Sequence, residues 1–346
     1  MSIEVSIKKR LGNFLLETEF NSEGGVTGLL GASGCGKSVT LRCIAGIIRP
    51  DEGHIAVKGR VLFDSAAHID LPPQKRRVGY LFQNYALFPN MTVEANIACG
   101  AAKTLDRHAR AKRVREMMEK MQLKGLEKHR PSELSGGQQQ RTALARILAG
   151  DPDALLLDEP FSALDSHLRE RVISELKKTL TAFGRDAVLV THSRDEAYQL
   201  CDRLALMQNG SIDAFGETRR IFACPETRAG AALTGCKNIV SAQKAGERRV
   251  FVPEWGITLQ TAAQVKDGLK AIGIRAHYFG NIEENSFHIT AEEAIEQPFE
   301  WTVRFRYEGQ EKNSPSVWWR VAKTAMPNTL PKRLGVSPDD VLLLYR

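Results

Sequence analysis

The sequence has no apolar run long enough to cross a membrane. A membrane-spanning helix needs about 20 mostly apolar residues, and no stretch of the 346 residues meets this requirement. Met1–Arg10 also lacks the apolar centre of a secretory signal. We therefore expect a chain without a membrane span or leader, either free in the cytosol or docked on a membrane partner.

Cysteine pairs at metal or redox spacing are also missing. No Cys-x-x-Cys pair occurs, and no His/Cys spacing suits zinc. Scattered single cysteines are typical of a reducing compartment. The six are Cys35, Cys43, Cys99, Cys201, Cys224 and Cys236.

Charge of one sign is not gathered into a block. The net charge is +7, yet acidic and basic residues interleave through 94–130 and 165–185. The densest basic stretch, 107–115, has no aromatic residues beside it for base stacking. We interpret it as a solvated helix face and expect no nucleic-acid partner.

Strand and helix signals alternate over the first 230 residues and predict an α/β domain with a largely parallel, helix-covered sheet. Val26–Leu30, Ala154–Leu157 and Val188–Val190 read as buried parallel strands. A helix-rich stretch, about 90–148, lies between the first two and predicts a helical subdomain. Its stripe of apolar residues at helical spacing is expected in the core. That stripe consists of Val114, Met117, Met118 and Met121.

The amino-acid composition and the pattern of apolar residues change after about residue 235. Tryptophan is absent before Trp255, and in Trp301–Tyr307 apolar and polar residues alternate as in a half-buried strand. We predict a second, all-β domain over 236–346, a small OB-like barrel. The boundary is expected between Pro225 and Asn238. Further strand candidates are Arg249–Val252, Ile257–Gln260, Ala271–Tyr278 and Val341–Tyr345.

A glycine-rich run follows the first predicted strand. Gly31–Ser38 fits G-x-x-x-x-G-K-[ST]. Its glycines let backbone amides turn toward phosphate oxygens, and a helix starting near Lys37 adds the positive end of its dipole. Lys37 can reach the β- and γ-phosphates, and the Ser38 hydroxyl can ligate Mg²⁺. The run predicts binding of ATP with Mg²⁺.

Two acids end the second predicted strand. Neighbouring strand residues point to opposite sides, so Asp158 and Glu159 need not share a role. Asp158 suits a Mg²⁺ contact, and Glu159 suits polarising water for attack on the γ-phosphate. A solvated strand end would explain two acids alone, but their combination with the phosphate loop favours a catalytic site.

A second glycine-rich run, ELSGGQQQR at 133–141, completes an ordered set of motifs. Together they resemble the ATP-binding subunit of a bacterial ABC importer, over about residues 2–230. The resemblance implies a P-loop ABC ATPase domain at 1–230 with Gly31, Ala32, Ser33, Gly34, Cys35, Gly36, Lys37 and Ser38 as Walker A, Leu155–Asp158 as Walker B, and Glu159, His192 and Gln83 as catalytic residues. It further implies Ser38, Gln83 and Asp158 at Mg²⁺, Asp165 in the D-loop, and Leu134, Ser135, Gly136, Gly137 and Gln138 as a signature motif acting on a second copy.

The same resemblance implies an assembly. Two copies would sandwich ATP, and integral membrane permease subunits would hold them at the cytoplasmic face of the membrane. A periplasmic or lipid-anchored binding protein would deliver cargo. One departure concerns the base: Leu11 stands where the family has an aromatic residue, so either Phe14 substitutes or adenine rests on an aliphatic surface.

Three stretches, Gly59–Asp64, Leu71–Tyr80 and Gly24–Gly28, together with the missing aromatic residue at Leu11, resemble the molybdate type of importer. This resemblance implies molybdate or tungstate as cargo, with sulfate or thiosulfate as the alternative. A soluble ABC ATPase acting on DNA or ribosomes is disfavoured, since no second cassette or long coiled-coil insertion is present. The C-terminal domain resembles the regulatory barrel of such subunits. An oxyanion-sensing barrel and a ligand-free, dimer-stabilising one both remain open.

Overall fold

The computed structural model describes residues 2–101, 106–162, 164 and 166–346, without the side chains of 2 and 166–168. The chain divides into two compact units, Met1–Thr218 and Arg219–Arg346. The domain limits expected from the sequence, 1–230 and 236–346, stay a prediction. Among the described residues, no helix is long and apolar enough to cross a membrane.

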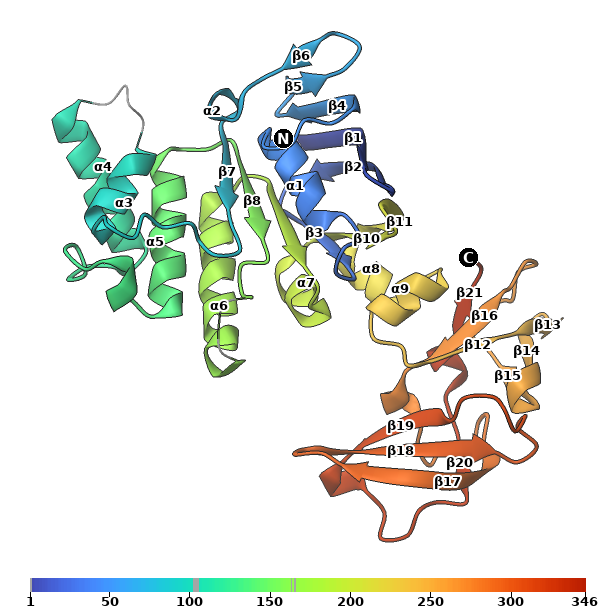
Figure 1. Cartoon of the computed structure of the whole chain (residues 1–346). Coiled ribbons are helices and arrows are strands. Elements are labelled where there is room, and N and C mark those ends of the chain that lie inside the picture. Colours follow the sequence, from blue (N-terminus) through green and yellow to red (C-terminus); the bar gives the residue numbers. More distant parts are fainter. Residues whose placement is uncertain (1, 102–105, 163, 165) are drawn as a thin grey trace. The chain divides into compact units, whose positions relative to one another are not determined.

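One half of the first unit's sheet is parallel, and its three central strands, β3, β9 and β8, are buried along their whole length. The sheet has 11 strands in the order β6-β5-β4-β1-β2-β11-β10-β3-β9-β8-β7. The three predicted strands are confirmed and lie side by side as β3, β9 and β8 (Figure 1). The parallel strands are β10 (Arg203–Gln208), β3 (Val26–Gly31), β9 (Ala187–Thr191), β8 (Ala154–Asp158) and β7 (Val78–Leu81).

The other half corrects the expectation of a largely parallel sheet. Its strands pair antiparallel apart from one parallel contact between β2 and β11. In β1 the buried Ile3, Val5 and Ile7 alternate with polar residues, a half-buried pattern typical of antiparallel sheets. These strands are β1 (Ser2–Leu11), β2 (Phe14–Glu23), β4 (Glu52–Val57), β5 (Arg60–Asp64), β6 (Ile69–Asp70) and β11 (Ser211–Glu217).

Helices cover the parallel half and build the predicted helical region. Helix α1 (Lys37–Ala45) contacts β3, β7, β8 and β9. The apolar stripe of Val114, Met117, Met118 and Met121 is buried, as predicted. The other helices of this unit are α2 (Pro73–Arg76), α3 (Val93–Gly100), α4 (Arg107–Lys120), η1 (Pro131–Glu133), α5 (Gly136–Ala149), α6 (Ser166–Phe183) and α7 (Arg194–Leu200).

The second unit is all-β beyond two short helices, α8 (Thr218–Ala223) and α9 (Arg228–Leu233). The predicted strands Arg249–Val252 and Ile257–Gln260 coincide with β14 and β15. Its sheets curl into a half-barrel around an apolar core. The first two sheets are β12 (Asn238–Ser241) with β16 (Ala271–Ile274) and β21 (Leu342–Leu344), and β13 (Gln243–Gly246) with β14 and β15. The third sheet is β19 (Val317–Ala322), β18 (Glu300–Tyr307), β17 (Phe287–Glu296) and β20 (Arg333–Leu334). Short 3₁₀ helices connect strands at η2 (Pro253–Trp255), η3 (Ala276–Tyr278), η4 (Lys323–Ala325) and η5 (Pro338–Asp340).

Candidate nucleotide-binding site

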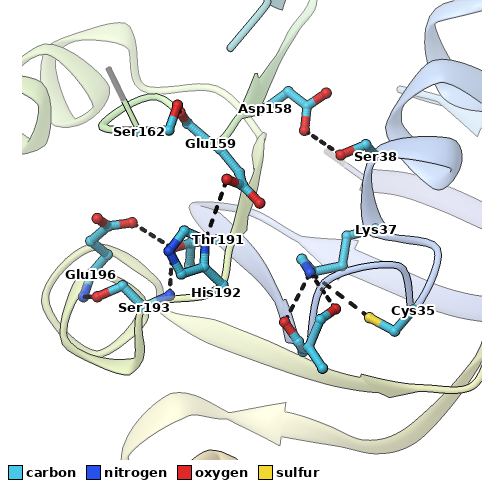
Figure 2. Close-up of polar contacts among 12 residues, drawn as sticks. Cys35, Lys37, Ser38, Asp158, Glu159, Ser162, Thr191, His192, Ser193 and Glu196 are labelled. Atoms are coloured by element: carbon cyan, nitrogen blue, oxygen red, sulfur yellow. Dashed lines mark hydrogen bonds and ion pairs between the residues drawn. The ribbon is translucent and has the colours of Figure 1, made fainter. Parts of the chain in front are cut away.

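The glycine-rich run forms a tight loop between β3 and α1. Gly34 and Gly36 have φ angles of 81° and 106°, a left-handed backbone that glycine adopts without a steric penalty. A Cβ on Gly36 would also lie 2.6 Å from Leu16 Cδ1. Lys37 is buried, and its Nζ donates hydrogen bonds of 2.8 Å to the carbonyls of Gly31 and Ala32 (Figure 2).

Asp158 receives a hydrogen bond on each carboxylate oxygen. Ser38 Oγ donates to Oδ1 at 2.7 Å, and Tyr80 Oη donates to Oδ2 at 2.7 Å. Burial and then the bond to Asp158 raise the pKa of Tyr80, so the phenol stays protonated and remains a donor. The sequence did not reveal Tyr80, whose role depends on β7 pairing in register with β8.

Glu159 and His192 follow adjacent strands and face each other. His192 Nδ1 lies 3.3 Å from Glu159 Oε2 (Figure 2). Glu159 has a φ of 45°, unusual for a residue with a side chain. Its N–H donates to the Val190 carbonyl at 3.0 Å, and its carbonyl accepts from the N–H of Ser162 at 3.1 Å. These bonds fix the turn in which the Asp158 side chain points toward Ser38 and the Glu159 side chain points toward His192.

The residues present fit a magnesium ion. Mg²⁺ in nucleotide sites is held through one or two protein oxygens together with phosphates and water. The Ser38 hydroxyl and the Asp158 carboxylate supply such hard oxygen donors beside the phosphate loop. A cage of three or more acidic, histidine or cysteine side chains does not occur within the described part of the chain, and a Mg²⁺–nucleotide site does not need one.

Other predicted site residues lie apart from this cluster. Gln83 is exposed, and in the described part of the structure Asp158 bonds Ser38 and Tyr80 and not Gln83. Asp165 lies outside the described residues. Leu134–Gln138 stands at the start of α5, where Ser135 Oγ accepts from the Gln138 N–H at 3.4 Å and Gln138 Oε1 accepts from the Ser135 N–H at 2.8 Å. Leu11 is 40% exposed, whereas Phe14 packs against the phosphate loop.

A further polar network connects the loop after Gln83 with α5. Tyr85 Oη and Gln140 Nε2 both donate to the Pro160 carbonyl at 3.1 Å. Arg146 of α5 donates to the carbonyls of Tyr85 and Ala86 at 3.0 and 2.8 Å. Burial raises the pKa of Tyr85 to about 12. The residue after Glu159 is therefore tied to the helical region, which sequence spacing alone does not show.

The strand-loop-helix with its buried lysine, beside an acidic strand end, defines the chain as a P-loop NTPase with a helical subdomain. Comparisons with known proteins identify the family within this class. The family model described as ABC transporter matches residues 19–162. The sulfate/thiosulfate import ATP-binding protein of Caulobacter vibrioides is 38% identical over 298 residues, which cover 84% of each chain. The chain belongs to the ABC transporter family of import ATP-binding proteins.

Other relatives carry different cargo names. The spermidine/putrescine import ATP-binding protein of Acidothermus cellulolyticus is 47% identical over 62% of this chain. The molybdenum import ATP-binding protein of Paramagnetospirillum magneticum is 40% identical over 67% of it. The chain spans only 55% and 63% of the length of these two relatives.

A solved structure matches the first part of the fold. The ATP-binding cassette MJ0796, described as dimeric in a post-hydrolysis state with ADP and phosphate, superposes with a TM-score of 0.52 at 29% identity. The match covers 63% of this chain and 99% of that one. This similarity supports the assignment of the first unit as an ABC cassette.

Proposed function

We propose that the chain is the ATP-hydrolysing subunit of an ABC importer. The observation that carries the proposal is the convergence of three groups at the ends of β3, β8 and β9. Lys37 lies in the phosphate loop, Ser38 is bonded to Asp158, and Glu159 faces His192. Each position has a distinct task in phosphoryl transfer to water.

In this mechanism the phosphate loop and Lys37 hold the β- and γ-phosphates. Ser38 and Asp158 would hold Mg²⁺, which neutralises developing charge on the phosphates when bound. The Glu159 carboxylate accepts a proton from the attacking water. His192, whose Nδ1 lies 3.3 Å from Glu159 Oε2, keeps the carboxylate oriented and contacts the γ-phosphate. The leaving group is ADP.

A second copy completes the site. In one chain Leu134–Gln138 lies on the helical region, and the described residues show no bond from this motif to Lys37 or Ser38. We propose that it binds the γ-phosphate held by a partner copy, whose approach ATP stabilises. The dimeric description of the MJ0796 cassette supports this arrangement.

Transport would follow from coupling to membrane subunits at the cytoplasmic face of the membrane. Arg146, Tyr85 and Gln140 connect the loop after Gln83 with α5 and with Pro160. A permease docked near Gln83 would thereby sense the state of Glu159. A separate binding protein would supply the cargo, because no residue of this chain needs to touch it.

The cargo we propose is molybdate or tungstate, with sulfate or thiosulfate as the second candidate. The linker stretches Gly59–Asp64 and Leu71–Tyr80 support the first, and the relative of Caulobacter vibrioides supports the second. Uptake of labelled molybdate, sulfate and spermidine in cells with and without the chain would decide. Loss of spermidine uptake alone would contradict both candidates.

The ATPase assignment is tested with Glu159→Gln. We expect ATP turnover to fall by about 100-fold or more, because the variant has no general base, and ATP-bound dimers to persist in size-exclusion chromatography. Glu119→Gln, an exposed residue of α4, is the control and should behave as wild type. Hydrolysis by Glu159→Gln at the wild-type rate would show that the base assignment is wrong.

A further inference from the structure

A buried carboxylate outside the proposed mechanism holds the segment that carries His192. Glu196 lies in the first turn of α7, and its side chain is only 3% exposed. Glu196 Oε1 accepts from Arg169 Nε at 2.8 Å and from Arg169 Nη2 at 2.6 Å. Its other oxygen accepts a short hydrogen bond from the Thr191 hydroxyl (Figure 2). Both carboxylate oxygens are therefore occupied by donors from other elements.

The contacts of Glu196 fix both neighbours of His192. Thr191 Oγ1, which donates to Glu196, also accepts from the Ser193 N–H at 2.9 Å. Ser193 Oγ in turn accepts from the Glu196 N–H at 3.4 Å. Thr191, Ser193 and Glu196 thus form a closed ring of hydrogen bonds around the backbone of His192. The exposed imidazole leaves this ring toward Glu159.

This arrangement exceeds what a helix cap requires. In an ordinary capping box, the glutamate three residues after the cap accepts directly from the N–H of the cap residue. Here the Thr191 hydroxyl stands between the Glu196 carboxylate and the Ser193 N–H. The carboxylate is also buried against Arg169, although burial of an ion pair costs desolvation energy that offsets much of its attraction. We therefore assign this pair a role in geometry and not in stability.

We propose that Glu196 is a positioning residue that sets the direction of His192 toward Glu159. Through Arg169 it also joins the His192 segment to α6, the helix that begins at Ser166 directly after residues 162–165. Movement at the start of α6 is thereby transmitted to His192 by two charge-assisted hydrogen bonds. This inference rests on the proposed ATP hydrolysis.

The first test separates position from stability. In the full-length protein, Glu196→Gln and Glu196→Ala are expected to lower kcat about 10-fold or more. KM for ATP should stay within about twofold, because Glu196 bonds Arg169, Thr191 and Ser193 and not the phosphate loop. Asp153→Asn is the matched control, because it breaks a partly buried acid–base cluster at the opposite end of β8. Its kcat should equal that of wild type. An equal fall of kcat in Asp153→Asn would overturn the inference.

The second test asks whether Glu196 acts through His192. The kcat of His192→Gln should fall no further when Glu196→Ala is added, because the positioned group is already gone. A full additional loss in the double variant would overturn the inference. If Glu196→Ala does not fold, Glu196→Gln, which keeps the side-chain shape, is used in the same cycle.

The third test does not depend on ATP turnover. The imidazole resonance of His192, assigned by its loss in His192→Gln, should shift when Glu159→Gln is introduced into the wild type. In the Glu196→Ala background, Glu159→Gln should leave the His192 resonance unshifted. A shift of equal size in both backgrounds would contradict the positioning role. Absence of ATPase activity in wild type would contradict the proposed function alone, because this spectrum would still report on Glu196.

Discussion

At the scale of single residues, the site depends on donors that hold carboxylates in fixed orientations. Asp158 is held by Ser38 and Tyr80, and Glu196 by Arg169 and Thr191. Hydrogen bonds to a buried carboxylate are stronger than those between neutral groups. Removing one such donor therefore changes both stability and geometry.

Tyr80→Phe removes one donor from Asp158 without changing the ring. We expect the free energy of unfolding to fall by about 1–3 kcal/mol. The Mg²⁺ concentration for half-maximal binding of a fluorescent ATP analogue should rise severalfold, because Ser38 alone then orients the carboxylate. Tyr85→Phe is the control, since Tyr85 donates to a neutral carbonyl. If both variants need the same Mg²⁺ concentration, Tyr80 does not orient Asp158.

Asp186 predicts a pH-dependent difference in stability. It is buried, only Oδ1 has a partner among the described residues, and burial raises its pKa. A raised pKa in the folded state stabilises the fold at low pH, and this contribution is lost as the pH rises through the folded-state value. The free energy of unfolding of Asp186→Asn, relative to that of wild type, should therefore be higher at about pH 7.5 than at about pH 4.

The control for Asp186→Asn has the opposite sign. The Arg10 N–H and the Lys9 ammonium lower the pKa of Asp51, so its contribution is present above the unfolded-state pKa and disappears in acid. Asp51→Asn should lose stability at about pH 7.5 and little at about pH 3. Urea unfolding of wild type and of each variant, at the two pH values given for that variant, measures the four differences. Parallel slopes for the two variants would contradict both assignments.

At the scale of elements, close backbone contacts set the position of α3 against α5. Gly100 ends α3, and a Cβ there would lie 1.7 Å from the Arg146 carbonyl oxygen of α5. Only glycine permits this approach. Because Arg146 also donates to the carbonyls of Tyr85 and Ala86, the contact supports the loop that follows Gln83.

Gly100→Ala is expected to separate α3 from α5. Forcing a methyl group into backbone contact costs about 1–3 kcal/mol or more, and thermal unfolding should occur at lower temperature. Cys99→Ala, at the exposed neighbouring position, should change stability by less than about 0.5 kcal/mol. Equal unfolding temperatures for wild type and Gly100→Ala would show that the two helices can move apart freely.

The helices and strands also show which parts of the fold and of the site can be predicted from the sequence. The strands β3, β8 and β9 and the phosphate loop follow from apolar runs and glycine spacing, which are local signals. Tyr80 and Glu196 act through partners on other elements, and their roles depend on strand pairing and helix packing that spacing does not encode. The left-handed backbone of Glu159 likewise depends on bonds to Val190 and Ser162.

At the scale of the whole molecule, the proposed action of the signature motif on a partner's nucleotide predicts that ATP hydrolysis is a property of pairs of chains. The rate of ATP hydrolysis should rise with roughly the square of protein concentration at concentrations where monomers predominate, because each site needs two chains. A coupled-enzyme assay over a dilution series of the protein, at concentrations where monomers predominate, measures this dependence. A rate strictly proportional to concentration down to the monomer range would contradict a shared site.

The position of Leu134–Gln138 also determines how defects combine. A copy with a defective phosphate loop still offers an intact signature motif, and a copy with a defective signature motif still offers an intact phosphate loop. Mixed together, a Lys37 variant and a Ser135 variant form heterodimers with one undamaged site and one doubly damaged site. Two inactive preparations would thus restore hydrolysis in each other, as alleles that complement within one gene.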